Sequence, residues 1–131
     1  MAVTALYAGL LAFIVIYLAT RVIGLRREKR VSRGDGESQS LAKVRGIHQN
    51  TVENGVLAML LMALAESLET HPLLLHGIGI VFIAARLIYA GAGLSHPENF
   101  RGRVIGMGTT FTCLGALALI CIATSVLSLS L

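Results

Sequence analysis

One short stretch concentrates ligand-binding side chains in a chain that is otherwise apolar. Residues 45–55, RGIHQNTVENG, carry a guanidinium, an imidazole, three amides and a carboxylate, and the apolar run VLAMLLMALA follows directly. On a helix of about 100° per residue, with Arg45 at zero, Gln49 falls at roughly 40°, Glu53 at roughly 80° and Asn50 at roughly 140°. We therefore predict one polar helical face that forms a recess for a polar ligand.

A simpler interpretation of the same stretch is that its first turns lie among lipid headgroups. Arg45, His48 and Gln49 would cost little there, because the headgroup region is polar and hydrated. That interpretation leaves Asn50 and Glu53 unexplained, since both extend into the apolar part of the helix. The two readings of the stretch stay open at this point.

Two charged residues are flanked on both sides by apolar helix, Glu53 and Arg86. A charge at the bilayer centre costs about 2.5–3.5 kcal/mol on insertion scales, so each needs a partner. If the helices reach the same membrane surface near Gly46 and Leu94, the two residues lie about 10 and about 12 Å deep. We predict a buried ion pair between them, which can coexist with ligand binding.

Composition places the whole chain in a membrane. It has 131 residues, of which 55% are hydrophobic and 14% are charged, which is more apolar surface than a soluble domain of this length can bury. Since about 20 residues cross the hydrocarbon core, the charge-free runs predict a single all-α domain, an integral membrane four-helix bundle. The expected helices are 2–23, 41–67, 72–95 and 102–129.

The basic residues predict the orientation of these helices. Eight of the eleven lysines and arginines lie between Arg21 and Arg45, and Arg101 and Arg103 lie before the fourth helix. The positive-inside rule places both of these loops in the cytoplasm and both termini on the other side. Topology and contact with anionic lipid explain this charge, and no nucleic-acid-binding pattern accompanies it.

Three smaller features bear on packing. Gly102 and Gly106 have a spacing that permits close approach of another helix. Ser38 or Ser40 is expected to cap the second helix, after a turn at Asp35 and Gly36. No cluster of cysteine or histidine has the spacing of a metal site, so no metal is expected.

These residues, taken together, resemble a known family. HQNTVEN (48–54), preceded by RVSRGDGE (30–37) and followed by ARLIY (85–89), is similar to the membrane-associated proteins in eicosanoid and glutathione metabolism, and most to small bacterial members. The family includes microsomal glutathione transferases and prostaglandin E synthase. The resemblance covers nearly the entire chain and implies a homotrimer in the bacterial inner membrane, with glutathione bound between subunits near the cytoplasmic side.

The resemblance also implies roles for individual residues. Asn50 and Glu53 would hold the peptide part of glutathione, with Glu53 receiving its α-amino group. Arg86 matches the arginine that opens the family's helix 3 motif, and Tyr89 matches a tyrosine of some branches. Arg101 lies near the position of the arginine that stabilises the glutathione thiolate.

Further cations surround these positions. Arg103 is a rival to Arg101 for the thiolate, and a basic vestibule with Arg26, Arg30 or Lys43 suits the two carboxylates of glutathione. Where the family pattern has an arginine four residues before the asparagine, this chain has Gly46, and Arg45 is the nearest substitute. Gln49 adds an amide to the same predicted face.

The function that follows is a glutathione transferase or peroxidase acting on lipophilic electrophiles that partition from the bilayer. The alternative is a non-catalytic trimeric binding or scaffold protein of the same fold. A small transporter or channel is a third and weaker hypothesis, because few charges lie within the membrane and no broken-helix pattern is present.

Overall fold

The chain folds into four long helices joined by short loops. The computed structural model describes residues 1–36 and 38–131, and within them it contains helices and no strand, which confirms the predicted all-α class. Glu37, the last residue of the RVSRGDGE stretch, lies outside the described residues. The helices are α1 (Ala2–Lys29), α2 (Gln39–Ser67), α3 (Pro72–Leu94) and α4 (Phe100–Ser130).

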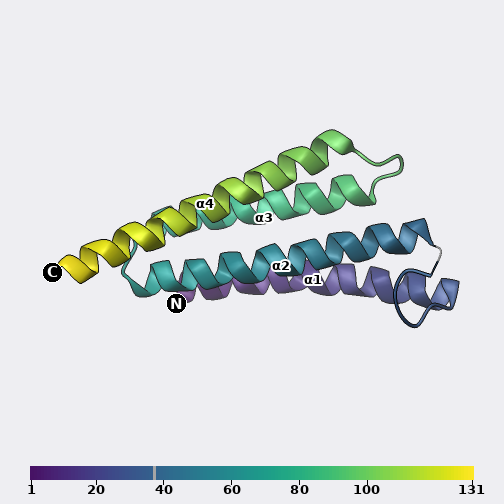
Figure 1. Cartoon of the computed structure of the whole chain (residues 1–131), viewed down its shortest axis with the longest axis horizontal. Helices are drawn as coiled ribbons and strands as arrows, with labels where there is room; N and C mark the ends of the chain where they lie inside the picture. The colour runs from purple at the N-terminus through teal and green to yellow at the C-terminus, as the bar shows by residue number, and fades with distance from the viewer. Residues whose placement is uncertain (37) are drawn as a thin grey trace.

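The helices run antiparallel, in an α1–α2 pair and an α3–α4 pair that lie side by side (Figure 1). Both termini lie at one end of the bundle, as predicted, and the α1–α2 and α3–α4 loops lie at the other. We call this second end the basic end, because most of the lysines and arginines lie there. The two pairs diverge toward the basic end (Figure 1).

Three of the helices, α1, α3 and α4, are long enough and apolar enough to cross a membrane. α2 has 29 residues, a length of about 43 Å, but its first half carries the polar residues of the 45–55 stretch. Because α2 joins the end of α1 at one side of the bundle to the start of α3 at the other, it must cross the same thickness. The protein is therefore an integral membrane bundle of four helices.

The first helix is longer than expected. It was predicted over 2–23 and continues to Lys29, because Arg26, Arg27 and Lys29 in its last turn interact favourably with the negative C-terminal end of the helix dipole. Arg30 ends it in a left-handed conformation, with φ 56°. The other three helices begin and end within two residues of their predicted bounds.

A serine and an asparagine side chain cap the N-termini of α2 and α4. Ser38 caps α2, as one of the two predicted alternatives, by accepting a hydrogen bond from the backbone N–H of Leu41 at 3.2 Å. Asn99 caps α4 by accepting one from Gly102 at 3.1 Å, which begins this helix two residues earlier than predicted. Both caps satisfy backbone donors at helix N-termini.

Glycines let α3 and α4 approach each other closely, as the spacing of Gly102 and Gly106 predicts. A Cβ atom on Gly106 would lie 2.7 Å from Tyr89 Cβ and 2.9 Å from the carbonyl oxygen of Ala85. A Cβ on Gly102 would lie 2.5 Å from Ala92 Cβ. This contact brings the first half of α4 against the last half of α3, where the candidate site lies.

At the opposite end, one carboxylate holds α1 against α2. Glu66, in the last turn of α2, accepts hydrogen bonds from the backbone N–H groups of Val3 and Thr4 at 3.0 and 2.8 Å, and from the Thr4 hydroxyl at 2.6 Å. An acceptor with negative charge suits the N-terminal end of a helix, where free N–H groups and the helix dipole both favour it. The α1–α2 pair is thus fixed far from the basic end.

The close contact at Gly106 gives a test of this packing. Gly106→Ala should lower the free energy of unfolding by about 1–3 kcal/mol, because its methyl group must displace backbone of α3. Gly108→Ala is the matched control, since no atom lies within 4 Å of the Cβ position there. Denaturant unfolding in detergent micelles measures both variants. Equal stability of the two would contradict the close approach.

Candidate functional site

Arg86 is the largest fully buried side chain in the described residues, with an exposed fraction of 0%. Its Nη1 donates to Asn50 Oδ1 at 2.6 Å, and its Nη2 donates to Thr110 Oγ1 at 2.8 Å and to Met107 Sδ at 3.2 Å. The guanidinium on α3 therefore joins α2 to α4. The atoms that accept hydrogen bonds from the Arg86 guanidinium are all neutral.

The predicted ion pair between Glu53 and Arg86 is wrong for the single chain. Glu53 is exposed and accepts a hydrogen bond from Gln49 Nε2 at 3.1 Å. Asn50, one helical turn earlier, faces α3 and takes the guanidinium. The depth of the two residues was estimated from helix geometry, but depth does not specify the direction in which Glu53 points around α2.

Tyr89 lies between two guanidinium groups. The Cζ of Arg86 is 4.7 Å from the centre of its ring and the Cζ of Arg103 is 5.5 Å from it, both within the range of cation–π interactions. Arg103 Nη2 also donates to the Tyr89 hydroxyl at 3.5 Å, and Arg103 forms an ion pair with Glu98. The hydroxyl thus lies beside a guanidinium at the basic end of α3.

A polar cavity opens beside this tyrosine, between α2 and the first turns of α4. Its volume is about 430 Å³, within the range of small-molecule sites. We call it the α2–α4 cavity; it is lined by Gln39, Ala42, Lys43, Gly46, Ile47, Asn50, Tyr89, Glu98 and Arg103. Two cations, two amides and a phenol hydroxyl in this lining, beside one carboxylate, can bind an anionic or strongly polar ligand.

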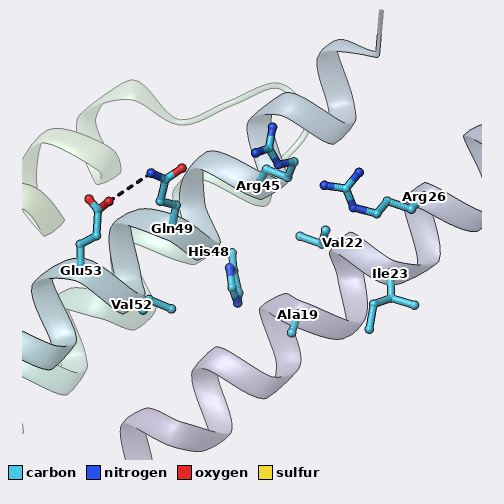
Figure 2. A pocket seen from close by; sticks show the side chains of 9 residues that line it. All are labelled: Ala19, Val22, Ile23, Arg26, Arg45, His48, Gln49, Val52 and Glu53. Carbon is cyan, nitrogen blue, oxygen red and sulfur yellow. Dashed lines mark hydrogen bonds between the residues drawn. The ribbon is translucent and has the colours of Figure 1, made fainter. Parts of the chain in front are cut away.

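A second hollow lies on the other side of α2, against α1 (Figure 2). This α1–α2 groove has a volume of about 500 Å³ and is lined by Ala19, Val22, Ile23, Arg26, Arg45, His48, Gln49, Val52 and Glu53. Arg26 extends from α1 toward α2, and His48 points into the groove from α2 (Figure 2). Arg45 also forms an ion pair with Asp35 of the α1–α2 loop. The groove offers two guanidiniums and a carboxylate to a zwitterionic ligand.

The predicted site residues therefore divide between two places. Asn50, Arg86 and Tyr89 come together at the α2–α4 cavity, whereas the three predicted residues Arg45, Gln49 and Glu53 line the α1–α2 groove. The prediction of one shared polar face on α2 is wrong, because Asn50 packs toward α3 and the other three lie toward α1.

The three other arginines considered from the sequence differ in whether they reach either hollow. Arg30 and Arg101 are exposed and line neither the α2–α4 cavity nor the α1–α2 groove. Arg103, the rival of Arg101, is the one that reaches Tyr89 in this chain.

Two residues that hold Arg86 were not predicted from the sequence. Thr110 is fully buried, and its hydroxyl accepts from Arg86 and donates to the carbonyl oxygen of Gly106 at 2.7 Å. Met107 lies one turn before it. A threonine within an apolar helix usually bonds its own backbone in this way, so nothing in the sequence distinguished Thr110 from Thr112, which does the same at 2.9 Å.

Comparison with known proteins shows the family of this chain. The model of the MAPEG family matches residues 4–123, which include α2 and α3 entirely and most of α1 and α4. The chain belongs to the MAPEG family. Inner membrane protein YecN of Escherichia coli is 37% identical over 113 residues, covering 86% of this chain and 84% of that protein. The same-named protein of a second Escherichia coli strain matches to the same extent.

Membership confirms that the chain is a MAPEG-type membrane protein, as its helices and the E. coli relatives both indicate. Both hollows lie in the matched region, and so do the cations that line them. Gly46, where the pattern expected from the family resemblance has an arginine, lines the α2–α4 cavity, and no atom lies within 4 Å of the position of a Cβ there. Arg45, its neighbour, is turned by about 100° into the α1–α2 groove.

The support of Arg86 in this MAPEG protein can be tested at Thr110. Thr110→Val keeps the shape of the side chain and removes one acceptor from a buried guanidinium, so it should lower the free energy of unfolding by about 1–2 kcal/mol. Thr112→Val is the matched control, because Thr112 is exposed on the same helix and its hydroxyl bonds only its own backbone. Unfolding in detergent compares the two. An equal loss for both would mean that the Arg86 contact contributes nothing.

Proposed function

We propose that this protein binds glutathione at its basic end and activates the thiol for attack on lipophilic electrophiles, as a transferase or peroxidase. The observation that carries this proposal is the position of Arg103, whose guanidinium lies on the Tyr89 ring and lines the α2–α4 cavity. Arg103 is the thiol-activating residue in this proposal, and Arg101 is the alternative. Membership in the MAPEG family supports glutathione as the thiol.

The chemistry requires a thiolate. A thiol with an ordinary pKa of about 8.5 is mostly protonated at neutral pH, and only the thiolate is a good nucleophile. Lowering that pKa by about two units takes about 2.7 kcal/mol of preferential stabilisation of the thiolate. One guanidinium in a partly dehydrated cavity can supply this amount, and the Tyr89 hydroxyl beside it is a second donor.

The atoms and electrons of the transferase reaction balance in the following way. The thiol proton leaves to water at the open, basic end of the cavity. The thiolate sulfur forms a bond with the electrophilic carbon, and the electron pair of the broken bond departs with the leaving group. In the peroxidase variant the thiolate sulfur attacks the outer oxygen of a hydroperoxide, the O–O bond breaks, and the alkoxide takes a proton from water and leaves as an alcohol. The sulfenic acid that remains reacts with a second glutathione thiol to give the disulfide and water.

The division of the site residues supports a binding site shared between copies of the chain. Glu53 and Arg45 line the α1–α2 groove, while Arg103 and Asn50 line the α2–α4 cavity, and α2 separates the two. One glutathione molecule can reach both sets only if the groove of one copy faces the cavity of another. A homotrimer, as expected for the family, closes such contacts into a ring.

In this arrangement the charges of glutathione are matched. The two carboxylates bind to Arg26 and Arg45 at the groove, and the α-amino group binds to Glu53. The thiol extends across the interface to Arg103. The electrophile enters from the bilayer, since all four helices expose apolar side chains along their membrane faces.

One observation favours the alternative, a non-catalytic trimeric binding or scaffold protein. Gly46 lines the α2–α4 cavity at the position where the family motif has an arginine. A cavity with one guanidinium fewer binds an anion less strongly and stabilises a thiolate less. The same fold could then bind glutathione without activating it, and the thiolate measurement below separates the two functions.

Thiolate formation tests the enzyme directly. Mixing the purified protein with millimolar glutathione should give the ultraviolet absorbance of a thiolate in stopped flow, together with a heat of binding in titration calorimetry. Arg103→Gln should reduce the thiolate signal at neutral pH by about tenfold or more, because each pKa unit regained is a factor of ten. Arg101→Gln is the matched control and should leave it unchanged.

The outcomes of this experiment are distinct. Binding without any thiolate signal in the unmodified chain would favour the scaffold function. A signal abolished by Arg101→Gln and retained by Arg103→Gln would overturn the assignment of Arg103. No heat of binding with the oligomer intact would overturn glutathione binding itself.

The shared site makes a second prediction. Chains with Arg103→Gln alone or Glu53→Gln alone should form inactive oligomers, since every site then lacks one half. Co-expression of the two variants should restore part of the conjugation activity, because some interfaces of a mixed oligomer receive both intact halves. Activity that stays at the level of the separate variants would mean that each site lies within one chain.

A further inference from the structure

A third hollow of the basic end lies between α1 and α3, away from the residues of the proposed glutathione site. Its volume is about 480 Å³. We call it the α1–α3 groove; it is lined by Phe13, Ile14, Tyr17, Arg21, Leu87, Ala90, Gly91, Leu94 and Ser95. It shares no lining residue with the α2–α4 cavity or the α1–α2 groove. The proposed reaction does not use it.

The groove is polar at one end and apolar at the other. Its α1 side runs about 12 Å from Phe13 to Arg21, and its α3 side runs antiparallel over the same length from Leu87 to Ser95. The guanidinium of Arg21 and the hydroxyl of Ser95 thus lie at the basic end, and Phe13 and Leu87 lie deeper. A ligand that fits the groove must likewise be polar at one end and apolar at the other.

Arg21 is the only charged residue in the lining. It is exposed, its Nη1 donates to the Tyr17 hydroxyl at 3.1 Å, and it has no carboxylate partner within the described ranges 1–36 and 38–131. It lies 19 residues after the start of α1, a distance of about 29 Å, which places it at the boundary between hydrocarbon and headgroups. The positive charge is therefore available at the depth of lipid phosphates.

The groove is lined by small residues where an acyl chain would pass. Gly91 has no atom within 4 Å of the position of a Cβ, and Ala90 next to it is small. Phe13 and Leu87 are 74% and 55% exposed, so their side chains stand free at the deep end. The groove thus offers apolar contact to a chain that lies along the helices.

We propose that the α1–α3 groove is a binding site for one anionic phospholipid of the cytoplasmic leaflet. The phosphate lies against Arg21 and the Tyr17 hydroxyl, and an acyl chain passes over Gly91 between Phe13 and Leu87. A single unpaired cation at headgroup depth above an apolar channel matches the charge and the length of such a lipid. A second copy of the chain fits less well, because the only charge that it would meet is this cation. The proposal is independent of glutathione binding.

Lipid binding by the purified oligomer tests the proposal. Native mass spectrometry after titration should count more bound dioleoylphosphatidylglycerol than dioleoylphosphatidylcholine on the unmodified chain. Arg21→Gln should weaken the phosphatidylglycerol affinity by about fivefold, the equivalent of about 1 kcal/mol for one cation at an anionic surface. Arg27→Gln removes the same charge from an exposed position of α1 outside the groove and should leave the affinity unchanged.

A second pair of variants tests the channel rather than the charge. Gly91→Leu should fill the groove and reduce binding of phosphatidylglycerol, whereas Gly24→Leu, which also has open space at its Cβ position, should not. Equal losses for Arg21→Gln and Arg27→Gln would mean diffuse attraction and overturn the site. Equal counts of the two lipids would overturn the phosphate contact. A change of oligomer mass with Gly91→Leu alone would show that another copy covers the groove, which also overturns the proposal.

Discussion

The burial of one guanidinium inside the bundle constrains the rest of the basic end. Arg86 lies where lipid cannot stabilise a charge, so the protein must surround it with acceptors. Those acceptors come from two other helices, Asn50 on α2 and Thr110 on α4. Thr110 can reach Arg86 only because Gly106 lets α4 approach α3. The buried charge therefore depends on the close helix contact.

The same constraint determines what the neighbouring helix can present to a ligand. Since Asn50 is committed to Arg86, the polar residues one turn away on α2 point toward α1, where they form a separate groove. α2 thus serves as a wall with a polar surface on each side. If identical chains close into a ring, as proposed for the glutathione site, the two surfaces can meet at each contact.

Much of this architecture follows from the sequence, and the part that does not has a physical reason. Charge-free runs predicted the spans, and the spacing of Gly102 and Gly106 predicted a close helix contact without specifying the partner helix, because length and side-chain size act locally. The polar stretch of α2 was located correctly, but its division between two faces was not. A helical wheel gives the angles between Gln49, Asn50 and Glu53 and does not say which neighbour each one meets. For the same reason the sequence predicted the wrong partner for Arg86. It also gave no sign of Thr110, because the role of Thr110 depends on its contact with α3.

The order in which the helices are synthesised gives the buried arginine one more consequence. α2 enters the membrane before α3, so Asn50 is already present when Arg86 arrives, but Thr110 and Met107 follow only with α4. During that interval the guanidinium has one protein acceptor, and the apolar remainder of α3 must outweigh its insertion cost. Until the last helix packs, the charge is free to draw water or a headgroup into the bundle. Completion of the chain, rather than insertion of the third helix, is the step that seals the membrane interior around Arg86.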